Sequence, residues 1–219
     1  MTELPFLCAT RAAYDSVAAD YTERFRAELA GKPLDRALLT AFAELVLAAD
    51  VGAVADVGCG FGHVTAYLHA LGVDAFGVDL SPEMVALGRR AYPGLRFDVG
   101  SMTALDLPDG ALGGIVAMYS IIHIPPDRLP EVLAEFHRVL APGGQLLLAF
   151  QVGDEQRHLT EAFGRAISLD VYRLLPDRIA ELLGQAGFVV HARMQREPDR
   201  PVEKVPQAHL LARRPADVT

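Results

Sequence analysis

The stretch VADVGCGFG, residues 54–62, decides how this chain can fold. An apolar run ends there in three glycines spaced G-x-G-x-G and leads into a helical pattern. Glycines at a strand-to-helix turn let the backbone adopt positive φ and let a ligand approach closely. A second apolar run, GVDLS at residues 77–81, places Asp79 about twenty residues after the first glycine. A carboxylate at that spacing in a β-α-β unit reaches a ribose diol, so the two runs predict a nucleoside pocket.

Two kinds of nucleoside cofactor compete for this pocket. A dinucleotide site expects G-x-G-x-x-G, and His63 stands where its third glycine belongs. Asp56 precedes the first glycine, Gly58, by two positions. A carboxylate there gives nothing to an anionic pyrophosphate, whereas the cationic methionine end of S-adenosylmethionine could use it. The pattern therefore favours S-adenosylmethionine, with a nicotinamide oxidoreductase as the alternative and a plain tight turn as the simplest interpretation.

Three further motifs follow the same order along the chain as in a known family. They are YDSVAADY at residues 14–21, LPD at 107–109 and LAPGG at 140–144. Together with the glycine turn and the acidic strand end, they resemble the class I S-adenosylmethionine-dependent methyltransferases, in particular the small-molecule branch. The resemblance covers roughly residues 11 to 214.

Strand and helix patterns alternate from residue 53 onward, which predicts an α/β fold: a parallel sheet with helices on both faces. Strands are expected near 53–57, 74–79, 95–99, 113–118, 146–150, 188–195 and 206–213. Helices are expected near 62–71, from the Ser81 N-cap and Pro82, between Asp127 and Leu140, and from Pro176 to Gly187. The resemblance implies a Rossmann-like sheet of seven strands in the order 3-2-1-4-5-7-6, with the last strand antiparallel.

The chain is expected to form a single structural domain. Residues 1–50 carry two amphipathic patterns and should form N-terminal helices that cover the active site. Residues 51–219 should form the cofactor-binding core. Residues 151–173 form a polar segment without a simple period, which predicts irregular structure. The resemblance implies that it is a cap insertion, near 151–175, that faces the substrate.

Composition narrows the partners of this chain. It has 219 residues and a net charge of −8, and only two lysines, so the clustered cations of a nucleic-acid site are missing. No apolar run is long enough to span a bilayer, and the first residues lack a secretory signal. Two cysteines, Cys8 and Cys59, do not suggest a disulfide framework. We expect a cytoplasmic protein with a small-molecule acceptor and no nucleic-acid or membrane partner; the oligomeric state stays open.

Most of the cofactor contacts are predicted along the glycine turn. Asp79 should accept hydrogen bonds from both ribose hydroxyls, while Gly58 and Gly60 give backbone access to the donor. Asp56 is expected to orient the turn or to reach the methionine ammonium through water. Cys59, where the resembling family often carries cysteine, fits as a small packing residue beside the cofactor.

At the adenine end the sequence departs from the family pattern, which places an acid after the third strand. Here Ser101 takes that place and can accept from the adenine amine without charge. Met102 and Leu80 should cover the two faces of the ring. Met118 should turn its carbonyl toward the methionine ammonium. The resemblance implies that Tyr14, with Tyr21 on the same helix face, reaches the methionine carboxylate. These contacts imply S-adenosylmethionine as donor and S-adenosylhomocysteine as product.

Two histidines are candidates for a general base, since an imidazole pKa near 6.5 suits proton removal at neutral pH. His123 follows the fourth strand, where the resembling family commonly has a histidine that simply lines the cofactor, and His158 lies in the cap segment. No metal-ligand spacing occurs, so no metal is expected. The acceptor atom is expected to be oxygen, then nitrogen, with a non-catalytic binding protein as another hypothesis. The cap also carries Arg157, Arg165 and Tyr172, compatible with a phenol, a carboxylate or a sugar.

Overall fold

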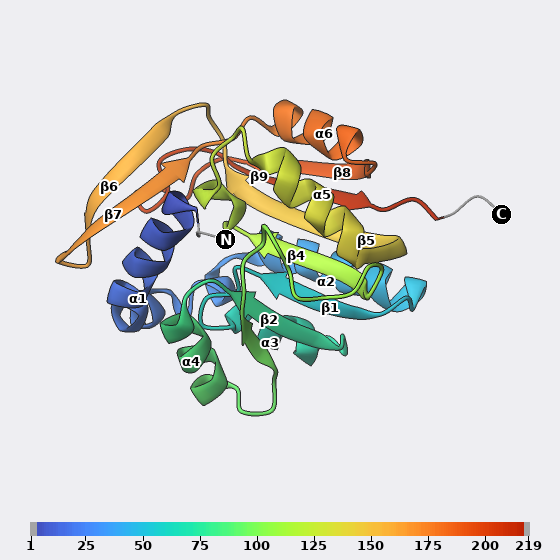
Figure 1. Cartoon of the computed structure of the whole chain (residues 1–219), viewed down its shortest axis with the longest axis horizontal. Coiled ribbons are helices and arrows are strands. Elements are labelled where there is room, and N and C mark those ends of the chain that lie inside the picture. Colours follow the sequence, from blue (N-terminus) through green and yellow to red (C-terminus); the bar gives the residue numbers. More distant parts are fainter. Residues whose placement is uncertain (1–3, 217–219) are drawn as a thin grey trace.

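Seven of the strands in the computed structural model, which describes residues 4–216, pair into one sheet (Figure 1). In spatial order they are β3 (Phe97–Val99), β2 (Ala75–Asp79), β1 (Ala53–Val57), β4 (Leu112–Met118), β5 (Leu140–Gln151), β9 (Gln207–Arg213) and β8 (Val189–Arg196). The strands β3, β2, β1, β4 and β5 pair in parallel, and β9 is antiparallel to both of its neighbours. The predicted fold class and strand order are confirmed.

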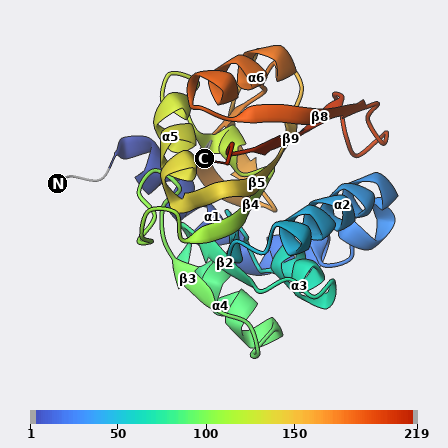
Figure 2. The ribbon, with the colours of Figure 1, turned by 90° about the vertical axis from the view of Figure 1, so that its right-hand side faces the viewer.

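Helices cover both faces of this sheet (Figure 2). On one face lie α2 (Pro33–Ala49) and α3 (His63–Ala70), whose apolar side chains pack against β1 and β5. On the other face lie α5 (Leu129–Val139) and α6 (Pro176–Gln185). The central strand β5 is buried from Gly144 to Phe150, which explains the continuous apolar run from Leu146 to Phe150.

The helix α4 (Pro82–Ala91) begins where the sequence predicts it. The Ser81 side chain accepts a hydrogen bond from the Met84 backbone N–H at 3.1 Å, and Pro82 occupies the first helical position. Val85 of α4 packs with Phe97 of β3 and Cys59 of the glycine turn in a small buried cluster. This cluster fixes the turn against the edge of the sheet.

The two N-terminal helices take different places, which the sequence did not separate. The helix α1 (Pro5–Phe25) lies over the carboxyl ends of β2 and β4, next to α4 (Figure 1). The helix α2, after the short η1 (Leu29–Gly31), packs instead on a face of the sheet, with Phe42 and Leu39 fully buried. Only α1 therefore covers the ligand-binding edge along its length, and α2 belongs mainly to the core.

The segment expected to be an irregular cap is a β-hairpin. Strands β6 (Gln156–Ala162) and β7 (Arg165–Tyr172) pair antiparallel in a separate two-stranded sheet. They turn at Phe163 and Gly164, which both have positive φ (53° and 71°), as a two-residue hairpin requires. The expectation of irregular structure was wrong, and the alternating Ile167, Leu169 and Val171 were the signal that it overlooked.

The tip of this hairpin rests on α1. Phe163 packs edge-on against Tyr21 and Phe25, with ring centroids 6.3 and 6.5 Å away. Arg165 donates from Nε to the Asp20 carboxylate at 3.0 Å. Helix and hairpin thus close together over the same edge of the sheet. No helix within residues 4–216 has the length and apolar character needed to cross a membrane.

Candidate active site

The three glycines of the turn after β1 serve different structural purposes. A methyl group on Gly58 would lie 2.2 Å from Ser120 Cβ, and one on Gly62 would lie 2.4 Å from the Phe97 ring. Both positions therefore require glycine for packing as well as for their positive φ. Gly60 has positive φ too, but a methyl group there would meet nothing within 4 Å. The turn consequently presents the backbone of Gly60 to open space.

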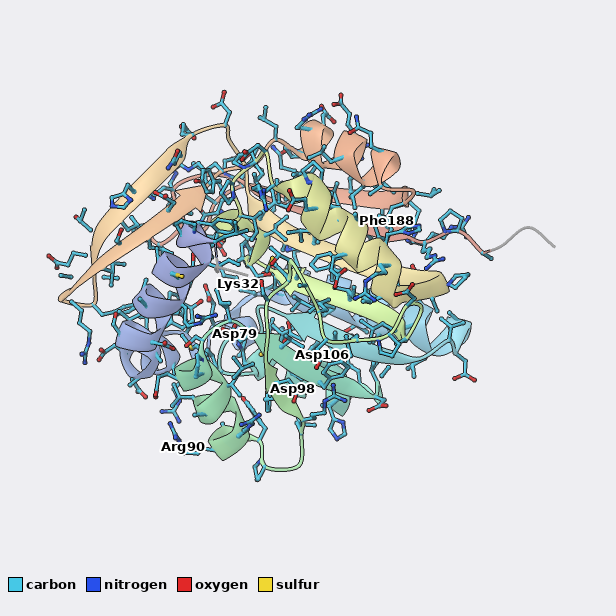
Figure 3. All side chains as sticks on the ribbon, in the orientation of Figure 1. Lys32, Asp79, Arg90, Asp98, Asp106 and Phe188 are labelled. Atoms are coloured by element: carbon cyan, nitrogen blue, oxygen red, sulfur yellow. The ribbon has the colours of Figure 1, made fainter. Side chains whose placement is uncertain are left out.

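Asp79, at the end of β2, holds this turn in place. Its carboxylate accepts from the Gly60 N–H at 2.7 Å and from the Ser81 N–H at 2.8 Å. Burial raises the pKa of Asp79 to about 6, although these backbone hydrogen bonds oppose the shift. Figure 3 shows Asp79 inside the molecule, in contrast to Arg90 on the outer side of α4. Each carboxylate oxygen has a second lone pair, so the group can still accept from a ligand.

A pocket opens beside Asp79, between α1 and the ends of β2 and β4; we call it the nucleoside pocket. Leu80, Ser101 and Met102, all predicted at the nucleoside end, line it. The Ser101 hydroxyl hydrogen-bonds the Thr103 hydroxyl at 2.8 Å and accepts from the Thr103 N–H. The remaining lining side chains include some that the sequence did not point to: Leu7, Thr10, Arg11 and Met84.

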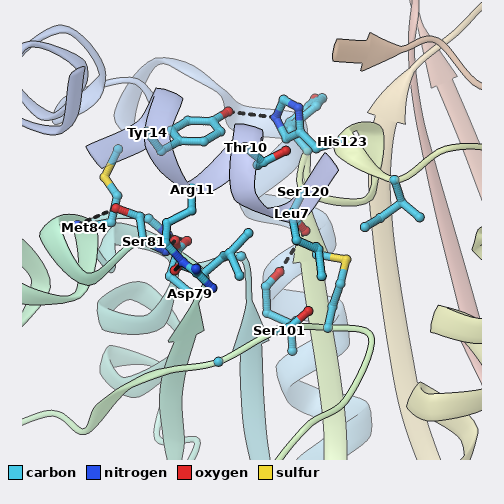
Figure 4. A pocket seen from close by; sticks show the side chains of 18 of the residues that line it. Leu7, Thr10, Arg11, Tyr14, Asp79, Ser81, Met84, Ser101, Ser120 and His123 are labelled. Atoms are coloured by element: carbon cyan, nitrogen blue, oxygen red, sulfur yellow. Dashed lines mark hydrogen bonds between the residues drawn. The ribbon is translucent and has the colours of Figure 1, made fainter. Parts of the chain in front are cut away.

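Figure 4 shows Leu7, Arg11 and Tyr14 of α1 at this pocket, and two polar contacts hold the helix there. Arg11 donates from Nε to the Leu80 carbonyl at 3.2 Å. The Ser81 hydroxyl donates to the Asp15 carboxylate at 2.5 Å, which ties α1 to the start of α4. The first turns of α1 were not predicted as part of the site. Pro5 at the first helical position, followed by apolar Phe6 and Leu7, was the available signal.

A second cavity of about 430 Å³ lies under the β6–β7 hairpin, and we call it the hairpin cavity. Side chains from the hairpin, from the end of α1 and from the segment 202–207 line it. It meets the nucleoside pocket at the glycine turn. The residues that line both spaces are Tyr14, Tyr21, Gly58, Gly60, Met118, Tyr119 and His123.

Tyr14 and His123 meet where the two spaces join. The Tyr14 hydroxyl is 2.7 Å from His123 Nε2, and His123 Nδ1 is 3.0 Å from the backbone carbonyl oxygen of Asp170 in β7. A carbonyl oxygen only accepts, so we assign the proton to Nδ1, and Nε2 then accepts from Tyr14 in the neutral imidazole. Burial lowers the pKa of His123, which favours this neutral form. Burial also raises the pKa of Tyr14 well above its usual value.

This pairing changes the expectation for Tyr14. Its hydroxyl proton points to His123, so it is not at the same time available to a ligand carboxylate, as the resemblance implied. Tyr21 packs edge-on against Tyr14, with ring centroids 5.7 Å apart. The short η2 (Ile121–His123) turns the His123 side chain toward α1. The hairpin, the helix and η2 therefore meet at one imidazole.

Asp56 and Cys59 lie beneath the turn, at the border of the hairpin cavity. The Asp56 carboxylate is 2% exposed and accepts from the Thr65 hydroxyl at 2.7 Å, and burial raises the pKa of Asp56 to about 7. This contact joins β1 to α3. The Cys59 thiol is buried among apolar side chains, and burial raises its pKa well above the usual value, so it is not a nucleophile.

The structure does not bring His158 to the site. Arg157 and Leu159, its neighbours on β6, line the hairpin cavity, so His158 points to the other face of the hairpin. There its Nδ1 pairs with the Asp170 carboxylate at 2.9 Å, with half of the side chain exposed. The position of His158 within the cap segment could not show on which face of the hairpin its side chain lies.

Tyr119 is the site residue that sequence reasoning missed most clearly. It follows Met118 at the end of β4, lines both spaces and has a φ of 54°. A positive φ in a bulky residue is rare and costs energy, and such strain gathers at ligand sites. The Tyr119 N–H donates to the Ala149 carbonyl at 2.8 Å, which holds this conformation.

The residues present fit S-adenosylmethionine. The open backbone at Gly60 leaves room for a ligand, the Asp79 carboxylate can accept from a ribose, and Leu80 and Met102 offer apolar contact to a base. Among the described residues, no group of three or more His, Cys, Asp or Glu is placed to hold a metal ion.

Residues 54–144 match a family model described as a methyltransferase domain. A malonyl-[acyl-carrier protein] O-methyltransferase of Pectobacterium atrosepticum is 32% identical over 113 residues, which are 51% of this chain and 44% of that protein. A demethylmenaquinone methyltransferase of Chlorobaculum parvum is 34% identical over 92 residues, 42% of this chain and 37% of that protein. This chain thus matches less than half of the length of either relative.

Solved structures agree in fold across more of the chain. The magnesium protoporphyrin IX methyltransferase of Synechocystis, solved with bound S-adenosylmethionine, superposes with a TM-score of 0.71 at 17% identity, covering 98% of this chain and 99% of its own. A methyltransferase from Methanosarcina mazei gives a TM-score of 0.67 at 18% identity, covering 75% and 92%. At such identities the likeness concerns the fold.

Proposed function

We propose that this chain transfers a methyl group from S-adenosylmethionine to a small-molecule acceptor, with oxygen as the acceptor atom. The match of residues 54–144 to a methyltransferase domain model and the fold shared with solved methyltransferases support the proposal. One observation carries the proposal. The nucleoside pocket and the hairpin cavity share lining residues at the glycine turn, among them Gly60, Tyr14 and His123. Two substrates can therefore meet there without sharing the same space.

When bound, S-adenosylmethionine supplies a methyl group on a positively charged sulfur. Asp79 holds the ribose, Leu80 and Met102 contact the adenine, and Ser101 accepts from its amine. Met118 offers its carbonyl to the methionine ammonium, and Asp56 keeps β1 and α3 in register beneath the turn. Fixing both reacting groups contributes up to about 7–11 kcal/mol to lowering the barrier, which makes positioning the main task of this site.

Tyr14 and His123 provide the route for a proton. Neutral His123 takes the Tyr14 hydroxyl proton at Nε2 as Tyr14 takes a proton from the acceptor hydroxyl. The resulting imidazolium donates from Nδ1 to the Asp170 carbonyl and from Nε2 to the Tyr14 oxygen, so both N–H groups have partners. The high pKa of Tyr14 means that the hydroxyl passes the proton on rather than standing ionised.

Oxygen is preferred because a neutral hydroxyl needs this proton acceptor before it attacks, whereas a neutral amine does not. The name of the Pectobacterium relative, an O-methyltransferase, points the same way. A small acceptor is preferred because the hairpin cavity is closed over by α1 and the hairpin, and because the net charge is −8.

A thermal-shift panel of S-adenosylmethionine, S-adenosylhomocysteine, NAD and NADP tests the donor. We expect the first two ligands alone to raise the melting temperature; a shift only with NAD or NADP would refute the proposal. Incubation with methyl-labelled donor and an extract of the source cells, followed by identification of the labelled compound, tests turnover. A labelled methyl ester or ether is expected, a labelled amine would move the acceptor to nitrogen, and donor binding without any product would indicate a binding protein.

A further inference from the structure

One face of the β6–β7 hairpin lines the hairpin cavity, and its charged residues are all basic. Side chains alternate between the two faces of a strand, and the cavity-facing set is Arg157, Leu159, Leu169, Val171 and Arg173. The outer face carries the His158–Asp170 pair instead. The Asp170 carboxylate thus faces away from the cavity, and the Arg157 and Arg173 side chains line it.

Arg157 and Arg173 are diagonal neighbours on this inner face. Arg157 pairs with Val171, and the Arg173 N–H donates to the Glu155 carbonyl, so the two arginines lie two positions apart across the strands. At that offset Cβ atoms are about 7–8 Å apart or slightly less, within reach of long side chains on a common ligand.

The segment that carries Lys204 adjoins the base of the hairpin. The Val152 N–H donates to the Pro206 carbonyl at 2.9 Å, and the Leu174 N–H donates to the Gln151 carbonyl at 2.9 Å. Residues 204–206 and 173–174 therefore flank the same short stretch at the end of β5. Lys204 also lines the cavity, so a third cation joins the two arginines.

These cations are incompletely neutralised. Within residues 4–216, the side chains of Arg157 and Lys204 make no hydrogen bond or ion pair. Arg173 is 13% exposed and gives Nη1 to Glu155 at 3.0 Å, but its buried Nε has no hydrogen-bond partner. A buried N–H without an acceptor is destabilising, and a ligand oxygen at Arg173 Nε would supply the missing acceptor.

The acids that line the same cavity are largely occupied elsewhere. Glu203 pairs with Arg196 and Lys32, and Asp35 faces Arg196 at 3.5 Å. Asp56 accepts from Thr65. Glu28 lines the cavity from beyond the end of α1 and interacts electrostatically with Lys32. The uncompensated charge at the hairpin is therefore positive.

Resting on the proposed function, we propose that the acceptor carries an anionic group, a carboxylate or a phosphate, which Arg157, Arg173 and Lys204 bind under the hairpin. Guanidinium groups hold such oxygens with paired, directional hydrogen bonds. Aromatic side chains, among them Tyr21, Phe25 and Phe61, line the rest of the cavity, which suits an acceptor with an aromatic or unsaturated body. The anion anchors the acceptor, and its hydroxyl turns to Tyr14.

The test is calorimetric binding of matched probes to the full chain saturated with S-adenosylhomocysteine. The probes are 4-hydroxybenzoate, 4-hydroxycinnamate and 6-hydroxy-2-naphthoate, each with its uncharged amide, and 4-hydroxyphenyl phosphate. We expect at least one anion to bind tenfold or more tightly than its uncharged counterpart. For 4-hydroxyphenyl phosphate, 4-hydroxybenzamide is the uncharged counterpart. A preference for phosphate over carboxylate would identify a phosphorylated acceptor, and the reverse order a free acid.

Arg157→Gln and Arg173→Gln should each reduce that preference at least fivefold and leave amide binding unchanged. Arg178→Gln, an exposed arginine of α6 paired with Glu181, is the matched control and should keep it. Arg157 is exposed, so its variant is expected to fold even if loss of the Arg173–Glu155 pair destabilises the other. Thermal melting checks both.

Equal affinity for acids and amides, no binding of any anion, or a preference that survives both hairpin variants would overturn this inference. The titration of S-adenosylhomocysteine itself is a separate measurement that bears on the proposed function. The probe titrations are repeated on the protein alone, so a failure of nucleoside binding would leave the anion preference measurable on its own.

Discussion

The nucleoside pocket and the hairpin cavity share one border and differ in how they are built. Asp79, Ser101 and the glycine turn reach the pocket from strand ends, in positions that the parallel sheet fixes. The hairpin cavity is closed by an insertion and by α1, which meet only through side chains such as Phe163 and Arg165. The pocket therefore follows from the fold class, whereas the cavity depends on side-chain contacts between the hairpin and α1, and substitutions should separate donor binding from acceptor chemistry.

The largest separation is expected for His123→Gln. The variant removes the proton acceptor for Tyr14, so turnover of a hydroxyl acceptor should fall by about 10²–10⁴-fold, with affinity for S-adenosylhomocysteine unchanged within about threefold. Initial rates with the labelled product of the extract assay, together with calorimetry, measure the two effects.

His158→Gln is the control for this experiment, since His158 lies on the outer face of the hairpin. It should keep the normal rate. If His123→Gln and Tyr14→Phe both retain full rate across pH 6–9, positioning alone carries the reaction and the acceptor is already a good nucleophile. A loss of donor affinity equal to the loss of rate would instead make His123 part of the cofactor contact.

Asp79→Ala should act on the pocket alone, weakening donor binding at least tenfold. The reason is the loss of ribose hydrogen bonds to a charged acceptor, about 1.5–3 kcal/mol, and of the Gly60 contact that shapes the turn. Calorimetry with S-adenosylhomocysteine measures the change, and Asp74→Ala, an exposed acid just before β2, is the matched control. Unchanged affinity would remove Asp79 from the pocket.

Acidification should weaken donor binding through the same carboxylate. Ribose hydroxyls stabilise the ionised form of Asp79, whose pKa burial raises to about 6. Affinity should therefore be constant above pH 6 and fall below it, by at most about tenfold per pH unit. Calorimetric titrations with S-adenosylhomocysteine from pH 5 to pH 8 measure this loss of affinity.

Asp56 is the competing group, because burial raises its pKa to about 7. The loss of donor affinity below pH 6 should persist in Asp56→Asn and disappear in Asp79→Asn. The opposite result would assign the pH dependence to the carboxylate under the turn.

The smallest expected effect is a gain. Ser101→Asp restores the acid that the resembling family places against the adenine amine, and should tighten donor binding about two- to fivefold, since a charged acceptor strengthens a hydrogen bond. Calorimetry decides. Weaker binding in a variant that melts normally would show that Ser101 does not face the adenine.

The sequence predicted the sheet and the nucleoside side of the site well because each signal is local. The Ser81–Pro82 helix start, the buried run in β5 and the acid at the end of β2 each specify their own structure within a few residues. The prediction of irregular structure at the hairpin failed for a related reason. Its alternation is clear only in β7, and a bulge between Leu159 and Glu161 interrupts the pattern in β6.

By itself, the sequence determined the alternation of strands and helices, the glycine turn and the place of Asp79 at a strand end, because strand ends in a parallel sheet meet at one edge whatever else the chain does. The strand order came from the resemblance. Only the tertiary structure decided that Tyr14 donates to His123, 109 residues away, and that Asp170 of the hairpin fixes its tautomer. It also decided that Arg157 faces the cavity while His158 faces outward. A strand has two faces, and the packing of the hairpin against α1 decides which face is turned to the cavity. No local sequence pattern contains that information.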